Sequence, residues 1–177
     1  KTQTATRIST SAGDETVTLT FPEAVRGTFT LSLSYTGTLN DKMHGFYRST
    51  YTAHGKEHTM AVTQFESTFA RYALPCIDEP AAKAVFELSV IVEPNLTVLS
   101  NTHEASSTVL PDGRLKVAFH PTPKMSTYLL ACVVGLFESI ERKSARGTTV
   151  RVFVTKGKEH QAHFALDVAT RCLDFYE

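Results

Sequence analysis

The chain has 177 residues, of which 42% are hydrophobic and 20% are charged, and its 18 basic residues balance 18 acidic ones. This length fits one domain with a sizeable core, and a neutral net charge gives no bulk attraction to nucleic acid or to an anionic membrane. No apolar run approaches the roughly 20 residues that a membrane-spanning helix needs. We therefore expect a soluble globular domain with no nucleic-acid partner and no membrane partner.

Alternation of apolar and polar residues predicts β-strands along most of the chain. The clearest case is Gly27–Tyr35, where Phe, Leu and Tyr alternate with Thr and Ser. Tyr128–Gly135 is almost wholly apolar, as is typical of a strand covered on both faces. About nine strands are predicted, with turns at the spacing of a β-sandwich: Thr16–Phe21, Gly27–Tyr35, Gly45–Ala53, His58–Phe65, Ala84–Val92, Leu96–Ser100, Leu115–His120, Tyr128–Gly135 and Thr148–Val154.

The period changes at the C-terminal end, in Lys158–Glu177. Apolar residues recur there at helical spacing, which predicts one amphipathic helix; its apolar face comprises Ala165, Val168, Ala169, Cys172, Leu173 and Tyr176. The sequence therefore predicts an all-β fold, with antiparallel sheets in a sandwich or saddle-like arrangement and a single helix at the C-terminal end.

Three cysteines, Cys76, Cys132 and Cys172, lie far apart and are odd in number. This pattern argues against a disulfide framework and favours a reducing compartment, so we expect a cytoplasmic protein.

The sequence also lacks the usual catalytic motifs. It has no H-E-x-x-H, no G-x-S-x-G and no Gly-rich phosphate loop. His160 and His163, with Glu159 beside them, have the three-residue spacing at which two His can share a metal, but no third ligand is apparent. We therefore predict that the chain holds no metal and has no catalytic residues of its own.

One segment, Thr63–Pro80, fits neither a helix nor a strand period and reads T-Q-F-E-S-T-F-A-R-Y-A-L-P-C-I-D-E-P. It resembles T-Q-F-E-x-T-x-A-R-R-x-F-P-C-F-D-E-P of the puromycin-sensitive-type zinc aminopeptidases, in the gluzincin aminopeptidase family. Two further stretches, at 39–49 and 123–131, resemble L-N-D-K-M-x-G-F-Y-R-S and P-x-M-S-T-Y-L-L-A of the same family, and 165–177 resembles its helix A-L-x-V-A-x-x-x-L-D-F-Y-E. Tyr72 departs from the usual second Arg, and Leu74 and Ile77 replace two Phe residues.

The resemblance implies a place in a larger enzyme. Residues 1–157 would be an N-terminal β domain that lacks its first strands, and 158–177 would be the first helix of a truncated catalytic domain. The full-length protein would be a zinc metallo-aminopeptidase that removes N-terminal amino acids from peptides, with its zinc site beyond Glu177. Alone, the fragment is expected to be inactive and zinc-free. Its partners would be peptide N-termini and the missing catalytic domain.

The resemblance also assigns two substrate-binding residues, Gln64 and Glu66. Glu66 would pair with the terminal ammonium of a peptide, a charge that distinguishes an end from an internal amide. Gln64 would line the pocket for the first side chain. The alternatives are a solvated loop carboxylate and an ordinary strand-end amide. By the same resemblance, we hypothesise a cis peptide bond between Glu66 and Ser67.

The other notable residues of this segment have structural interpretations. We expect the charges of Arg71, Asp78 and Glu79 to fix the loop by an ion pair or by backbone hydrogen bonds, and Cys76 to be an inert buried thiol. Two other functions stay open, a free-standing β-sandwich interaction module without catalysis and a structural domain with a well-packed loop. The residues that follow Glu177 in the gene product would distinguish them from the enzyme.

Overall fold

A computed structural model describes residues 2–177 of the chain. Every strand ladder in this part is antiparallel. The strands are β1 (Arg7–Ser11), β2 (Thr16–Thr20), β3 (Gly45–Ala53), β4 (Lys56–Gln64), β5 (Ser89–Val92), β6 (Thr97–Ser100), β7 (Glu104–Val109), β8 (Leu115–Phe119), β9 (Cys132–Gly135), β10 (Phe137–Lys143) and β11 (Thr149–Thr155). The helices are the 3-10 turns η1 (Ala70–Tyr72), η2 (Thr127–Leu129) and η3 (Glu159–Gln161), and α1 (Ala162–Tyr176).

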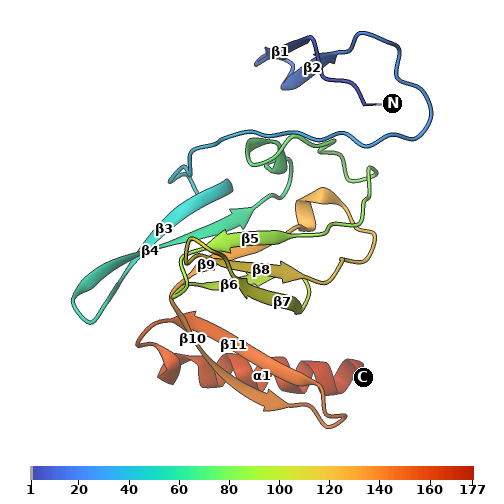
Figure 1. The fold of residues 1–177 in the computed structure, drawn as a ribbon. Helices are drawn as coiled ribbons and strands as arrows, with labels where there is room; N and C mark the ends of the chain where they lie inside the picture. Colours follow the sequence, from blue (N-terminus) through green and yellow to red (C-terminus); the bar gives the residue numbers. More distant parts are fainter. Residues whose placement is uncertain (1) are drawn as a thin grey trace.

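The centre of the molecule is a small β-sandwich. One sheet has the strand order β3-β4-β9-β6 and the other β5-β8-β7 (Figure 1). Their facing side chains form the core, because alternate residues of a strand point to the same face of its sheet. This core contains Val98, Cys132, Val117 and Phe119, with Phe46, Leu88, Val90, Val92, Leu115 and Val134 packed against it. The all-β prediction with a single C-terminal helix is confirmed.

The longest hairpin, β3–β4, leads directly into the irregular segment. Its register runs from Ala53 opposite Lys56 to Gly45 opposite Gln64. His54 and Gly55 form the two-residue turn, and both have positive φ angles, 49° and 72°, which suits the twist of a tight hairpin. The register places Gln64 at the end of the sheet, beside Gly45.

Helix α1 packs against the β10–β11 hairpin (Figure 1). Its buried residues are Ala162, Leu166 and Thr170. The apolar face predicted from the sequence points elsewhere: Val168 and Cys172 are exposed, and Tyr176 is 83% exposed. The helix therefore has one packed stripe and one apolar stripe in solvent. Among residues 2–177, no helix is both long enough and apolar enough to span a bilayer.

Several predicted strands differ from the structure. Gly27–Tyr35 belongs to no strand, and only the last four residues of Ala84–Val92 and of Tyr128–Gly135 are strand. Alternation shows which face of a segment is apolar, but it does not show whether a neighbouring strand supplies hydrogen bonds. Three strands were missed, β1, β7 and β10, because their sequences are polar or charged and carry little alternation.

Candidate substrate-binding segment

Glu66 lies between two buried anchors at the start of the irregular segment. Phe65 is 4% exposed and Ala70 is 0% exposed. A turn joins them, in which the Phe69 amide donates to the Phe65 carbonyl at 2.9 Å, and η1 follows directly. The chain is thus held on both sides of Glu66 while the Glu66 side chain stays exposed.

The structure brings the two predicted site residues together at the end of β4. The Gln64 side-chain amide donates to the Glu66 carbonyl at 3.4 Å, and both residues are exposed. The Glu66 carboxylate makes no hydrogen bond or ion pair with any residue from 2 to 177, which leaves it open to a ligand. The peptide bond between Glu66 and Ser67 is cis, as hypothesised from the resemblance.

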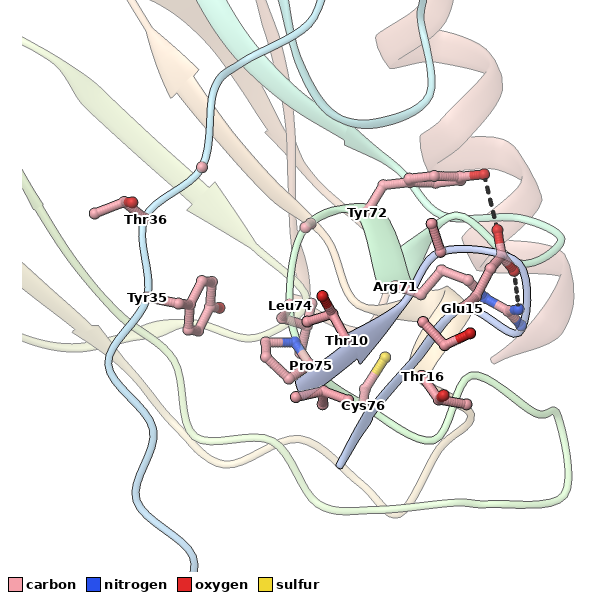
Figure 2. A pocket seen from close by; sticks show the side chains of 15 residues that line it. Thr10, Glu15, Thr16, Tyr35, Thr36, Arg71, Tyr72, Leu74, Pro75 and Cys76 are labelled. Atoms are coloured by element: carbon pink, nitrogen blue, oxygen red, sulfur yellow. Dashed lines mark hydrogen bonds and ion pairs between the residues drawn. The ribbon is translucent and has the colours of Figure 1, made fainter. Parts of the chain in front are cut away.

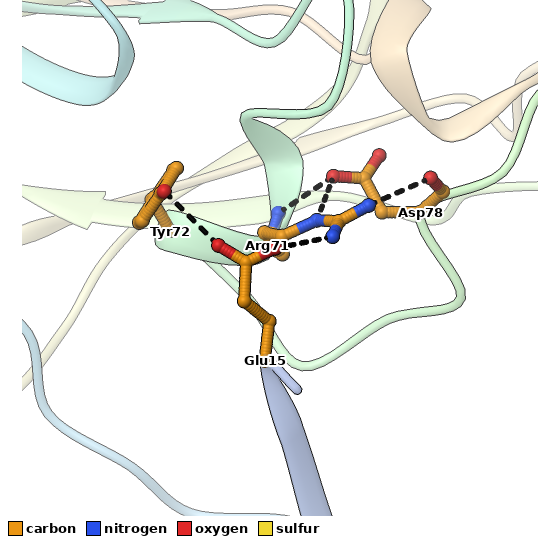
Figure 3. Close-up of polar contacts among 4 residues, drawn as sticks. All are labelled: Glu15, Arg71, Tyr72 and Asp78. Carbon is orange, nitrogen blue, oxygen red and sulfur yellow. Dashed lines mark hydrogen bonds and ion pairs between the residues drawn. The ribbon is translucent and has the colours of Figure 1, made fainter. Parts of the chain in front are cut away.

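Arg71 forms the centre of a polar cluster just beyond this turn (Figure 3). Its backbone amide and its Nε atom both donate to Oδ2 of Asp78, each at 3.1 Å, and its Nη2 atom donates to the Asp78 carbonyl at 3.2 Å. Asp78 is only 7% exposed. This confirms the expected ion pair and backbone bonds for Arg71 and Asp78. The same prediction is wrong for Glu79, whose exposed side chain makes no hydrogen bond or ion pair with any residue from 2 to 177.

The outer side of Arg71 contacts a residue that sequence analysis did not identify. Its Nη1 atom donates to the carboxylate of Glu15, which also accepts a hydrogen bond from the Tyr72 hydroxyl at 3.1 Å (Figure 3). The hydrogen bonds from Arg71 and then Tyr72 lower the pKa of Glu15 below its ordinary value. Glu15 lies in the turn between β1 and β2, more than 50 positions from Arg71, and no local pattern signals such a contact.

The stretch at 39–49 packs against the same turn. The His44 ring lies 4.7 Å from the Phe69 ring and 5.6 Å from the Tyr72 ring, measured between centroids. Gly45 has a positive φ of 68°, and a side chain there would come within 3.1 Å of the Tyr72 Cβ atom. Glycine therefore meets both the backbone geometry and the close approach at this position.

The base of the irregular segment is anchored at each end. The Cys132 amide donates to the Thr63 hydroxyl at 2.9 Å, and the Ser126 hydroxyl donates to the Pro80 carbonyl at 2.6 Å. Ser126 belongs to the stretch at 123–131. The two stretches at 39–49 and 123–131, which are distant in the sequence, thus both contact this segment.

An open hollow of about 670 Å³ lies beside η1 and does not include Gln64 or Glu66 (Figure 2). The β1–β2 hairpin, residues 35–37 and residues 71–76 form its walls. Cys76 contributes to this wall, and burial, with a smaller effect from Asp78, raises the pKa of its thiol. Cys76 is only partly buried, so the expectation of a buried thiol is wrong. A raised pKa disfavours the nucleophilic thiolate, in agreement with an inert role.

Metal ligands do not cluster in the described part of the chain. No group of three or more His, Cys, Asp or Glu side chains among residues 2–177 could hold a metal ion. His160 and His163 are both exposed at the start of the C-terminal helical region. Residues 2–177 therefore do not fit a zinc site.

Comparison with known proteins defines the class of this domain. The chain belongs to the peptidase M1 N-terminal domain family, whose family pattern matches residues 1–129.

Its relatives are aminopeptidases by name. The chain is 47% identical over 148 residues to the puromycin-sensitive aminopeptidase of Caenorhabditis elegans, an alignment that covers 82% of this chain and 16% of that protein. It is 46% identical over 166 residues to aminopeptidase M1 of Arabidopsis thaliana, covering 93% and 19%. It is 38% identical over 169 residues to endoplasmic reticulum aminopeptidase 1 of Rattus norvegicus, covering 94% and 18%. The chain therefore spans about a fifth of the length of these relatives.

Proposed function

We propose that the chain is the N-terminal β domain of a zinc metallo-aminopeptidase, which removes N-terminal amino acids from peptides. Residues 1–157 would form this domain, and 158–177 would begin the catalytic domain. The observation that carries the proposal is the similarity to aminopeptidases over most of the chain, together with the contacts of two family-like stretches, 39–49 and 123–131, with Thr63–Pro80.

In this proposal Glu66 recognises the free amino end of the substrate, and Gln64 lines the space for the first side chain. Two observations support these roles: the exposed Glu66 carboxylate has no hydrogen bond or ion pair with residues 2–177, and the Gln64 amide donates to the Glu66 backbone carbonyl. A carboxylate held by rigid flanks attracts an ammonium group with little further ordering, which favours a substrate end over an internal amide.

Zinc would be held by residues outside this chain, because no suitable cluster exists among residues 2–177. When bound, a catalytic zinc polarises a carbonyl and activates water. The contribution of the present chain would be to bind and orient the amino end of the peptide. We also propose a cytoplasmic location, which the three free cysteines support.

The test is an assay of the full-length gene product that contains these 177 residues. We expect hydrolysis of peptides with a free N-terminus, no hydrolysis of the N-acetylated peptides, loss of activity on zinc chelation and recovery when zinc is restored. Equal hydrolysis of free and acetylated peptides would contradict a role in recognising the amino end. Peptide binding without any hydrolysis would favour an interaction module instead.

A further inference from the structure

We infer that Arg71 is a positioning residue for Glu66, and that it acts through its ion pair with Asp78. This inference rests on the proposed function, because it concerns how the amino-end carboxylate is held. It assigns to the Arg71–Asp78 pair a task beyond stability: keeping the turn from 66 to 69 in the geometry that binds an ammonium group.

The first support is the connection between Arg71 and the turn. Arg71 follows Ala70, which is 0% exposed, and the turn that carries Glu66 closes on Phe65 by the bond from the Phe69 amide. The Arg71 amide, at the start of η1, has Asp78 Oδ2 as its acceptor. The conformation of η1 therefore depends on the position of the Asp78 carboxylate. The backbone path by which the chain leaves the turn that carries Glu66 depends on it as well.

The second support is the chemistry of the pair. Asp78 is 7% exposed, so its carboxylate needs a compensating cation and donors. Arg71 supplies both from one planar group: Nε bonds the carboxylate and Nη2 bonds the Asp78 carbonyl. A Lys side chain keeps the charge but cannot make both bonds in a fixed plane. Arg71→Lys should therefore keep the fold and loosen the geometry.

The third support is that the Arg71 side chain connects Asp78, within the irregular segment, to the β1–β2 turn. Its inner side contacts Asp78, and its outer side contacts Glu15 from the β1–β2 turn (Figure 3). The six residues between Arg71 and Asp78 contain no strand and no helix beyond η1. Without the contacts of Arg71 with Asp78 and Glu15, the irregular segment would be held mainly by its hydrogen bonds at Thr63 and Pro80 and by the packing around η1.

The experiment is a double-mutant cycle in the full-length gene product, with Arg71→Lys, Glu66→Gln and the double variant. The readout is kcat/KM for a leucine coumarin amide, together with the inhibition constants of leucine amide and of its des-amino analogue. We expect Arg71→Lys alone to lower kcat/KM about three- to thirtyfold. It should also weaken the binding of leucine amide, seen as a higher inhibition constant, and leave the binding of the des-amino analogue unchanged. In the Glu66→Gln background, Arg71→Lys should have almost no further effect.

The matched control is Arg114→Lys, because Arg114 forms the same kind of ion pair with Asp112 in the β7–β8 turn, away from the site. It should leave kcat/KM unchanged. Asp78→Asn is the second test variant, and it should lower kcat/KM as Arg71→Lys does. The test therefore does not depend on a single variant giving clean kinetics. Hydrogen exchange of the 66–70 amides should rise in both site variants and not in the control.

The outcomes distinguish the proposed function of Glu66 from the positioning role of Arg71. If Glu66→Gln itself has no effect on kcat/KM, the proposed function of Glu66 fails. If Glu66→Gln is impaired but Arg71→Lys lowers kcat/KM by the same factor in both backgrounds, Arg71 is only a structural residue and the inference is wrong. Equal weakening of leucine amide and the des-amino analogue would also overturn it.

Discussion

Arg71 presents both its backbone amide and its side-chain Nε atom to one oxygen of Asp78, Oδ2, at 3.1 Å in each case. Local secondary structure supplies few hydrogen bonds between residues 71 and 78, so this pair largely fixes the path of the chain there. It also lies five positions after Glu66, the residue proposed to meet the substrate. Stability and site geometry are therefore linked at this point.

Asp78→Ala should destabilise the 177-residue chain, because the Arg71 amide and the Arg71 Nε atom lose their shared acceptor, a carboxylate that is nearly closed to water. We expect a loss of about 1–3 kcal/mol in the free energy of unfolding, measured by urea denaturation. The control is Asp112→Ala, whose carboxylate pairs with Arg114 at the surface and should change stability little. Equal losses in the two variants would show that burial of Asp78 does not matter.

The two apolar stripes of α1 should respond differently to truncation. Leu166 is 4% exposed and packs on the β10–β11 hairpin, so Leu166→Ala should cost about 2–5 kcal/mol of unfolding free energy. Phe175, on the same helix, is 83% exposed, so Phe175→Ala should be almost neutral in the isolated chain. Thermal unfolding followed by circular dichroism compares them, and a larger loss for Phe175→Ala would contradict the packing described above.

The three cysteines should differ in their reaction with iodoacetamide at pH 8. Cys172 is exposed and should be alkylated first. Burial raises the pKa of Cys76, which should react more slowly. Burial raises the pKa of Cys132 to about 11, so only about one thiol in a thousand is ionised at this pH.

Mass spectrometry of the peptides gives the order of labelling. Cys132 should become reactive only when denaturant is added, which serves as the positive control. Labelling of Cys132 at the rate of Cys172 in the native chain would show that β9 is not buried in the sandwich.

Part of the fold could be predicted from the sequence because its signals are local. The strand Gly45–Ala53 was predicted to the residue, since it is rich in aromatic residues and Thr and is followed by the short loop that contains His54 and Gly55. Gly27–Tyr35 alternates more strictly and is not a strand, because strand formation also requires a hydrogen-bonding neighbour, which alternation does not reveal.

The candidate site likewise contains contacts that could be predicted from the sequence and contacts that could not. The Arg71–Asp78 pair joins residues seven positions apart, and its charges within an irregular segment predicted it. The contact of Arg71 with Glu15 depends on where the β1–β2 hairpin lies, and nothing near Arg71 in the sequence signals it. The roles of Gln64 and Glu66 come from the family resemblance alone, since an exposed carboxylate at a strand end has no distinguishing pattern.

The most direct test of the account is Glu66→Gln in the full-length gene product, assayed with a peptide that has a free N-terminus. The substitution keeps the shape of the side chain and removes its charge, so kcat/KM should fall about ten- to hundredfold, the range expected for a lost charge-assisted hydrogen bond. Glu79→Gln, an exposed carboxylate of the same segment, should leave kcat/KM unchanged. An unaltered kcat/KM in a folded Glu66→Gln protein would contradict the proposal that this domain recognises the amino end of the substrate through Glu66.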